Sequence, residues 1–343
     1  GSDAVVQEKS VLHLNLTGAF DERTNEKEAI KSALLGNSGE TVTSLETILK
    51  ALKVAKDNKN IKGVFVECKG NSAGLATLFE IRKALQDFKK SGKFVVAYGN
   101  EGITQGDYYL ASVADSIILN PVGIVDIHGL SSTIPFFKNL LDKIGVEMQI
   151  IRVGTFKSAV EPYVETQASP ANRMATEVYL NSIWGNLCDS ISNSRSIPVK
   201  KLNELASSLM LTQKGDYFIS NQIVDELKYR FEVINMLKEK TEVGENNDLR
   251  LVTPEQVAAL DIPKVHADKV AVVYAVGEID GSSNEGVVSS TLVKDIIKIA
   301  NDDAVKAVVL RVNSPGGSAF GSEQIWAALE EVKKKGKPFA VSM

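Results

Sequence analysis

The chain has 343 residues, of which 44% are apolar and 24% are charged, and its formal net charge at pH 7 is −4. This composition is typical of a globular protein, and the length predicts two domains. The mild acidity gives no reason to expect nucleic acid as a partner, and no stretch approaches the ~20 apolar residues that span a bilayer.

In the first half of the chain, short β-branched runs alternate with amphipathic segments. The pattern predicts strands at 11–16, 63–68, 94–98, 116–119 and 148–153. Helices are expected at 44–56, with Ser44 as the N-cap, and at 75–90 and 134–144. Such alternation is typical of a parallel sheet with crossover helices, so the fold class is α/β.

A long helical section follows. Ser169 and Pro170 supply a capping side chain and a proline at the first helical position, which predicts a helix over 170–193. Further helices are expected at 198–209 and 221–240. The polar run 241–248 lacks periodicity and is the best candidate for a linker.

The most informative pattern is an internal repeat. Residues 11–21 match 270–280, residues 61–66 match 305–310, and the helices that follow align without a gap. Units that share a pattern are expected to share a fold. The predicted domains are therefore a first unit at 3–240, a connector at 241–263, and a second unit at 264–343 that is expected to be truncated.

A glycine turn in the second unit is the first candidate site. Gly316 and Gly317 lie between the strand predicted at 307–312 and the helix predicted at 322–332. A turn of this kind can leave backbone N–H groups free to bind an anion or a developing oxyanion. It can equally be a turn that needs glycine for its dihedral angles. The matching stretch in the first unit, 69–74, lacks paired glycines, which suggests that the two units divide their roles.

Lys157 is the second candidate. It follows a predicted strand within 152–159, a sequence of mostly small or apolar residues. Apolar surroundings disfavour the ammonium form, which would lower the lysine pKa and allow the amine to act as a general base. The alternative is a loop lysine that simply reaches solvent.

Other polar segments carry weaker signals. A nucleophile would project from the turn after the strand at 94–98, but Thr104 and Gln105 stand there in place of serine or cysteine. Asp126 and His128 could form an acid–base pair, although a turn explains their spacing equally well.

The remaining titratable residues suggest no bound group. The three histidines are isolated, so no metal is expected, and we expect no cofactor. Cys68 and Cys188 lie far apart in apolar contexts and are expected to be buried free thiols.

Four segments together resemble signal peptide peptidase A, the long two-copy form of the protease IV family of serine peptidases (family S49). They are RVGTFKSAVEPY at 152–163, QGDYYLAS at 105–112, GIVDIHG at 123–129 and LRVNSPGGSAFGSEQIW at 310–326. The resemblance covers essentially the whole chain. It implies two tandem units with a fold similar to the Clp protease subunit and the crotonases.

The resemblance also implies a mechanism. In this family a serine–lysine dyad is shared between the two copies, and the matching lysine here is Lys157. The turn that contains Gly316 and Gly317 would supply oxyanion donors. The family serine lies within a motif whose first two letters match Ser342 and Met343, so the nucleophile is expected beyond the 343 residues, and the fragment itself is expected to be inactive.

The resemblance further implies the setting. The substrates would be apolar signal peptides, the protein would assemble as a homo-oligomer, and an amino-terminal helix absent from this chain would anchor it in the bacterial inner membrane, facing the periplasm. The opening Gly1 and Ser2 are typical of an expression-tag remnant. Two alternatives remain: a crotonase-like acyl-CoA enzyme that uses the same turn, and a non-catalytic scaffold.

Overall fold

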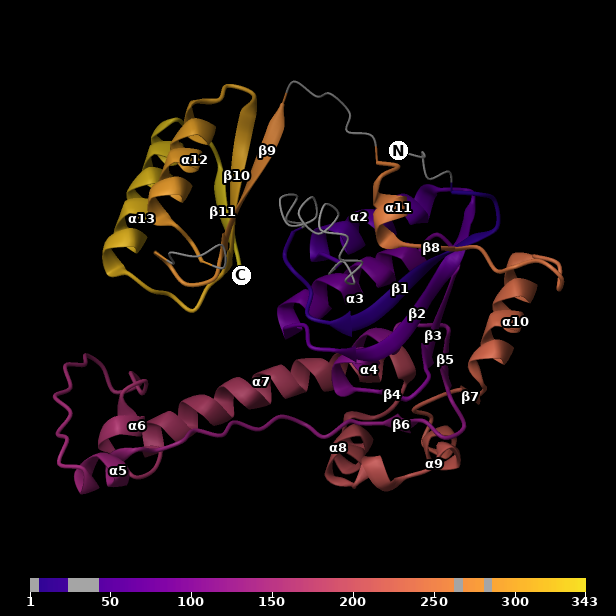
Figure 1. The fold of residues 1–343 in the computed structure, drawn as a ribbon, viewed down its shortest axis with the longest axis horizontal. Coiled ribbons are helices and arrows are strands. Elements are labelled where there is room, and N and C mark those ends of the chain that lie inside the picture. The colour runs from indigo at the N-terminus through magenta and orange to yellow at the C-terminus, as the bar shows by residue number, and fades with distance from the viewer. Residues whose placement is uncertain (1–5, 24–42, 262–267, 281–285) are drawn as a thin grey trace. The chain divides into compact units, whose positions relative to one another are not determined.

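The computed structural model describes residues 6–23, 43–261, 268–280 and 286–343. The chain forms two compact units, Gly1–Leu260 and Asp261–Met343 (Figure 1). The boundary therefore falls inside the connector predicted at 241–263.

The first unit is built on a six-stranded sheet in the order β7-β5-β3-β2-β1-β8. Every strand pairing in it is parallel. The strands are β1 (Ser10–Gly18), β2 (Ile61–Asn71), β3 (Phe94–Gly99), β5 (Ser116–Leu119), β7 (Glu226–Leu227) and β8 (Leu251–Val252). A separate pair is formed by β4 (Gly102–Ile103) and β6 (Ile124–Val125). The predicted α/β class with a parallel sheet is confirmed.

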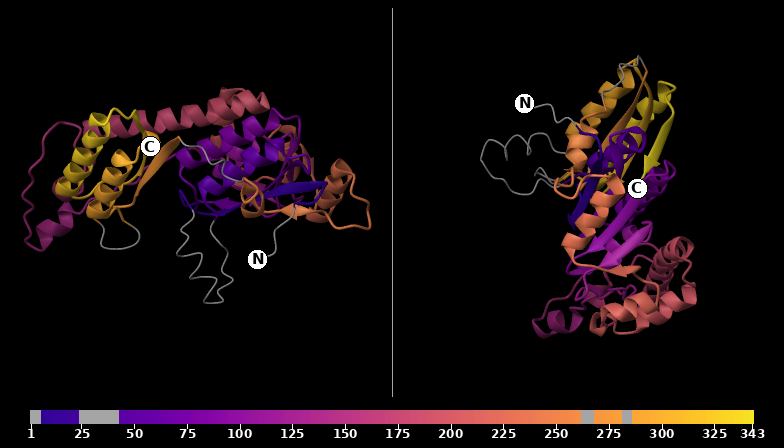
Figure 2. Two further views of the ribbon diagram at one scale, coloured as in Figure 1. Left: turned by 90° about the horizontal axis from the view of Figure 1, so that it is seen from above. Right: turned by 90° about the vertical axis from the view of Figure 1, so that its right-hand side faces the viewer.

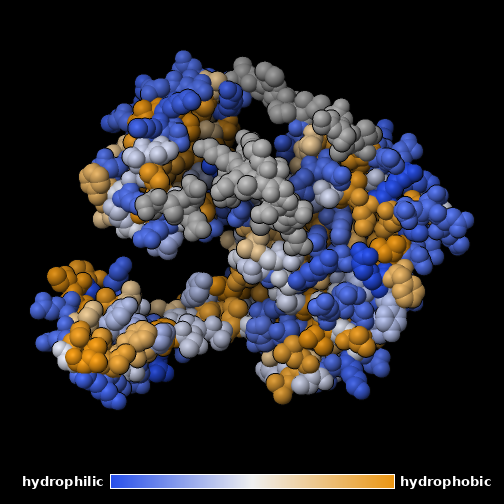
Figure 3. Space-filling model, in the orientation of Figure 1, coloured by the Kyte–Doolittle hydropathy of each residue, from blue (hydrophilic) through white to orange (hydrophobic). Residues whose placement is uncertain are grey.

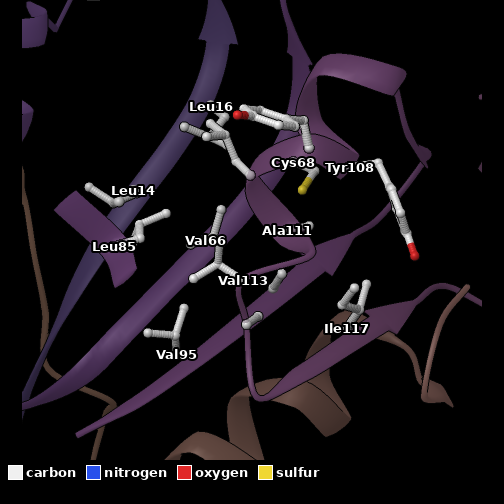
Figure 4. Packing of buried hydrophobic residues seen from close by; sticks show 14 of the residues in the cluster. Leu14, Leu16, Val66, Cys68, Leu85, Val95, Tyr108, Ala111, Val113 and Ile117 are labelled. Carbon is white, nitrogen blue, oxygen red and sulfur yellow. The ribbon is translucent and has the colours of Figure 1, made fainter. Parts of the chain in front are cut away.

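Helices cover both faces of this sheet. The larger core lies between the sheet and α2 (Leu45–Asp57), α3 (Leu75–Lys89), α4 (Gln105–Ala111) and α11 (Pro254–Ala258). Figure 4 shows part of this packing, to which Val66 and Cys68 of β2 and Tyr108 and Ala111 of α4 contribute side chains. On the other face, α10 (Arg230–Thr241) buries Val233 and Leu237 against the strands.

Local sequence signals set several helix boundaries. The Ser44 side chain accepts a hydrogen bond from the Thr47 N–H, and the Ser169 side chain accepts one from the Asn172 N–H, so both predicted N-caps are confirmed. The helix that starts at Pro170 ends at Arg195 and is called α7. Two further helices follow it, α8 (Val199–Ser207) and α9 (Gly215–Ser220), separated by the 3₁₀ turn Met210–Thr212.

The amino-terminal half of α7 reaches away from the sheet of its unit and carries two short helices at its end (Figures 1 and 2). These are α5 (Lys138–Lys143) and α6 (Glu161–Val164), which lie together because Phe137 stacks on Tyr163 at 6.1 Å. We call residues 130–180 the arm. Figure 3 shows that apolar side chains gather on its surface.

One predicted strand does not form, and two predicted helices are shorter than expected. No strand forms at 148–153, where Ile151 is 99% and Val153 is 91% exposed, because a strand needs a hydrogen-bonded neighbour and this segment has none among the described residues. The helix predicted at 134–144 shrinks to α5. The helix predicted at 221–240 begins only at Arg230, because Glu226 and Leu227 pair with β5 instead.

The second unit has a three-stranded parallel sheet in the order β11-β10-β9. Its strands are β9 (Lys269–Val276), β10 (Val305–Asn313) and β11 (Phe339–Ser342), and its helices are α12 (Ser289–Asn301) and α13 (Ala319–Lys334). The same neighbour order, third strand–second strand–first strand, occurs in β3-β2-β1 of the first unit. Each unit has its own apolar core.

Both cysteines are free and buried, as the sequence predicted. Burial raises the pKa of the Cys68 thiol well above its ordinary value, so this thiol stays protonated and inert. Among the helices in the described ranges, none has the length and apolar character needed to cross a membrane.

Candidate functional site

Lys157 lies in the arm, between a turn and α6. Gly154 adopts a φ of +95°, which favours glycine, and its carbonyl accepts a hydrogen bond from the Lys157 N–H at 3.4 Å. The Lys157 side chain is exposed within this unit. The apolar neighbours seen in the sequence are themselves exposed, Phe156 among them, so they do not cover the amine here.

A buried carboxylate lies four residues after Lys157. Glu161 is 1% exposed and accepts hydrogen bonds from the Ser169 hydroxyl at 2.6 Å, the Ser169 N–H at 3.1 Å and the Asn172 amide at 2.9 Å. The Arg152 guanidinium lies 3.8 Å away. The hydrogen bond from the Ser169 hydroxyl is the largest influence and lowers the pKa of Glu161, whereas burial opposes it. Glu161 therefore stays ionised in the arm.

The glycine turn of the second unit follows β10, as predicted. Gly317 has a φ of +151° and lies against Ile279, so closely that an added Cβ would sit 2.5 Å from the Ile279 carbonyl oxygen. The Ile279 N–H donates to the Gly316 carbonyl at 2.9 Å, and the Ser318 N–H donates to the Ile279 carbonyl at 3.4 Å. Only glycine fits at Gly317, because any side chain would break this contact.

One N–H group of this glycine turn, that of Gly317, is left open within the described residues. The Gly316 N–H donates to the Ser314 hydroxyl at 3.2 Å, and the Gly317 N–H donates to no group within the described residues of the chain. Ser318 then caps α13 by accepting from the Gly321 N–H at 3.1 Å. The turn therefore joins a strand end to a helix start, a geometry that favours a bound negative charge.

Asp280 joins the starts of two helices beside the turn. Its carboxylate accepts a hydrogen bond from the hydroxyl of Ser289, at the start of α12. Hydrogen bonds from the side chains of Ser289 and Ser318 lower the pKa of Asp280, and the bond from Ser289 has the larger effect. An added Cβ at Gly321 would lie 2.5 Å from this carboxylate, so the glycine at that position makes room for it.

The corresponding turn of the first unit is already filled. Asp107 is fully buried, and its carboxylate accepts hydrogen bonds from the Gly70 N–H at 2.9 Å and the Asn71 N–H at 3.3 Å. The Asn71 side-chain amide adds a third at 2.5 Å. The N–H groups of Ser72 and Ala73, which align with Gly316 and Gly317, are also used inside the unit: they donate to the Gly18 carbonyl at 2.8 Å and to the Asn71 side-chain oxygen at 3.2 Å.

Gln105 stands where the first unit would carry a nucleophile, and its side chain is also hydrogen-bonded inside the unit. Its side-chain oxygen accepts from the backbone N–H groups of His128 and Gly129, at 3.0 and 2.9 Å. Its amide nitrogen donates to the Gly129 carbonyl at 3.0 Å. Gln105 therefore fastens the loop after β6 to the start of α4 and has no nucleophilic chemistry to offer.

Asp126 and His128, the possible acid–base pair, lie within hydrogen-bonding distance of each other but at an exposed turn. His128 Nδ1 lies 3.0 Å from a carboxylate oxygen of Asp126, and the imidazole is exposed. Its backbone already holds Gln105, so a turn explains the pair. Within the described ranges, no group of three or more potential metal ligands occurs.

Three acidic residues were missed from the sequence: Asp107, Glu161 and Asp280. A weak signal existed for two of them. Asp107 stands three residues after Thr104, which is capping spacing, and Glu161 directly precedes Pro162 at the start of a helix. Their hydrogen-bond partners come from other elements of the fold, so spacing alone could not reveal them.

Comparison with known proteins adds independent information. A family model described as peptidase family S49 matches residues 87–244. Protease 4 of Salmonella typhi and protease 4 of Haemophilus influenzae (strain ATCC 51907 / DSM 11121 / KW20 / Rd) are each 36% identical over 362 residues, covering 100% of this chain and 58% of their own length. The chloroplastic serine protease SPPA of Arabidopsis thaliana is 27% identical over 355 residues, 98% of this chain and 49% of that protein. The chain thus spans about half the length of the curated relatives it matches.

Proposed function

The chain belongs to peptidase family S49, with protease 4 and signal peptide peptidase A, and from this membership we propose that it is part of a serine peptidase with a serine–lysine dyad. Lys157 is the general base. Gly316 and Gly317 supply the oxyanion donors. The nucleophilic serine comes from residues outside these 343, since Gln105 occupies the matching position in the first unit.

The mechanism is that of an activated hydroxyl. The neutral Lys157 amine takes the proton from the serine hydroxyl as its oxygen attacks the peptide carbonyl, and the N–H groups of the turn hold the resulting oxyanion. When the C–N bond breaks, the Lys157 ammonium gives its proton to the leaving amine. Water then hydrolyses the acyl ester with the same base.

As a general base, Lys157 must be in its neutral form before it can accept a proton. The amine must therefore be covered when the complete site assembles, so that desolvation disfavours its charged form. The exposed apolar side chains around it, including Ile151 and Phe156, are suited to make that cover.

The contrast between the two turns is the observation that carries the proposal. In the first unit the residues aligned with Gly316 and Gly317 are Ser72 and Ala73, whose N–H groups donate to the Gly18 carbonyl and to the Asn71 side chain, whereas the second unit leaves the Gly317 N–H open within the described residues. This contrast supports tandem units of one fold that divide the chemistry, with the base in one and the oxyanion donors in the other.

The motifs at 105–112, 152–163 and 310–326 also support a substrate class and a location. The substrates are cleaved signal peptides, which are extended and apolar, and the protein acts at the bacterial inner membrane, facing the periplasm, through an amino-terminal anchor. The exposed apolar side chains of the arm support assembly into a homo-oligomer, since patches of this kind mark interaction surfaces.

A hydrolysis assay on the protein from the complete reading frame tests this function. We expect it to cleave a synthetic apolar peptide with the sequence of a signal peptide, and we expect the 343-residue chain alone to show no turnover. Binding of a coenzyme A thioester without peptide cleavage would favour a crotonase-like enzyme. If the complete protein neither cleaves the peptide nor binds the thioester, a scaffold is favoured and the proposal is overturned.

A further inference from the structure

The ionised Glu161 stands out because the arm is otherwise poor in buried groups. Neither α5 nor the loop 145–157 buries a single side chain. A buried carboxylate is costly unless donors or a cation compensate it, and Glu161 receives three hydrogen bonds. A buried, hydrogen-bonded carboxylate in an otherwise exposed segment indicates that Glu161 holds the surrounding backbone in a defined conformation.

The contacts of Glu161 close a loop. Arg152 approaches its carboxylate from the start of the loop, and Glu161 itself ends it, while Ser169 and Asn172 tie Glu161 to the first turn of α7. Lys157 lies between Arg152 and Glu161, about midway. The loop is therefore fixed at both ends to a helix of 26 residues, which is the most regular element of the arm.

The backbone carries this constraint inward to Lys157. The Glu161 N–H donates to the Ser158 carbonyl at 3.0 Å, and the Ser158 N–H donates to the Phe156 carbonyl at 3.0 Å. The Lys157 N–H in turn donates to the Gly154 carbonyl. A short run of local hydrogen bonds thus leads from the buried carboxylate to the backbone of the lysine.

We infer that Glu161 is the positioning residue for Lys157: it clamps the 152–161 loop to the start of α7 and so fixes where the amine is presented. This inference rests on the proposed function, in which Lys157 is the base. A purely architectural carboxylate would stabilise the arm without affecting the geometry of proton transfer. The two roles differ in kinetics, because a misplacement of about 1 Å in a reacting group can cost roughly 10²-fold in rate.

The experiment compares Glu161→Gln with Glu165→Gln in the protein from the complete reading frame. Glu165 lies one turn further on and is exposed, so it provides a matched control. For Glu161→Gln we expect kcat to fall about 10- to 100-fold per folded molecule with KM unchanged, together with a shifted pH profile of kcat. Glu165→Gln is expected to match the wild type in kcat, in KM and in the pH profile of kcat.

A second variant guards against a folding defect. Arg152→Gln removes only the partly exposed cation and leaves the buried hydrogen bonds of Glu161 in place. We expect a smaller fall in kcat in the same direction. If both variants fold and keep the wild-type kcat and pH profile while Lys157→Ala is inactive, the inference is wrong and the proposed function survives. If Lys157→Ala keeps its turnover, both fail.

Discussion

Asp107 offers a direct test of how the first unit is built. Its carboxylate fills the turn at Gly70 and Asn71, so the substitution Asp107→Ala would leave three donors without their acceptor. The result is a pocket of the size and charge preference of a small carboxylate. We expect the variant to fold and to be less stable.

The magnitude follows from the burial of the donors. An unsatisfied buried donor costs about 1–3 kcal/mol. Gly70 is exposed and Asn71 is half-buried, so water can replace part of what is lost. The lower end of the range then applies to each donor, and the total is about 3 kcal/mol. For a unit of this size, such a loss lowers the melting temperature by roughly 6–12 °C.

The assay must isolate the first unit, because the two units need not melt together. Trp184 belongs to the first unit and Trp326 to the second, and they are the two tryptophans of the chain. In a Trp326→Phe background, the fluorescence of Trp184 reports the first unit alone. The substitution Asp57→Ala, at an exposed helix end, is the matched control and is expected to have little effect.

Added formate sharpens the experiment. Formate at about ten times its dissociation constant would return about 1.4 kcal/mol to the Asp107→Ala variant, and it would leave the wild type unchanged. A variant that melts within about 2 °C of the wild type, or one that formate does not stabilise, would refute the view that Asp107 is an internal ligand of this turn.

Two further predictions concern stability. Burial alone would raise the pKa of Glu67, but hydrogen bonds from His13 and Arg230 outweigh it and lower the pKa to about 2. The unfolded chain then binds more protons than the folded one below about pH 4.3, so the stability that Glu67 contributes is lost as the pH falls from about 5 to 2. The free energy of unfolding, measured by urea denaturation across this pH range, should depend less steeply on pH in Glu67→Gln than in the wild type. An unchanged dependence on pH would argue against this pairing. In the second unit, Gly317→Ala places a Cβ against the Ile279 carbonyl, so hydrogen exchange at the Ile279 amide should accelerate. Unchanged protection there would mean that the turn does not need this contact.

Most of the first sheet could be predicted because its signals are local. The strand at Ser116–Leu119 and the N-cap at Ser169 follow from apolar runs and capping residues within a few positions of each other. The segment 148–153 has equally good strand residues, yet it forms no strand. Strand formation depends on a partner that is distant in the chain, and local pattern carries no information about that partner.

In the candidate site, too, local features could be predicted from the sequence, whereas features that depend on distant partners could not. Gly316 and Gly317 could be recognised because a glycine turn between a strand and a helix is a local pattern. The role of Glu161 could not, since Arg152, Ser169 and Asn172 meet it only after the arm folds. The exposure of Lys157 within its own unit agrees with the alternative that the sequence left open, a loop lysine that reaches solvent.

The central claim is that Lys157 is the base of a peptidase, and the turnover of Lys157→Ala tests it most directly. The protein from the complete reading frame should lose peptide hydrolysis on this substitution and keep its fold by circular dichroism. Lys143→Ala, a change at an exposed lysine of the same arm, should leave hydrolysis unchanged. Turnover by Lys157→Ala at the rate of the Lys143→Ala control would contradict the account.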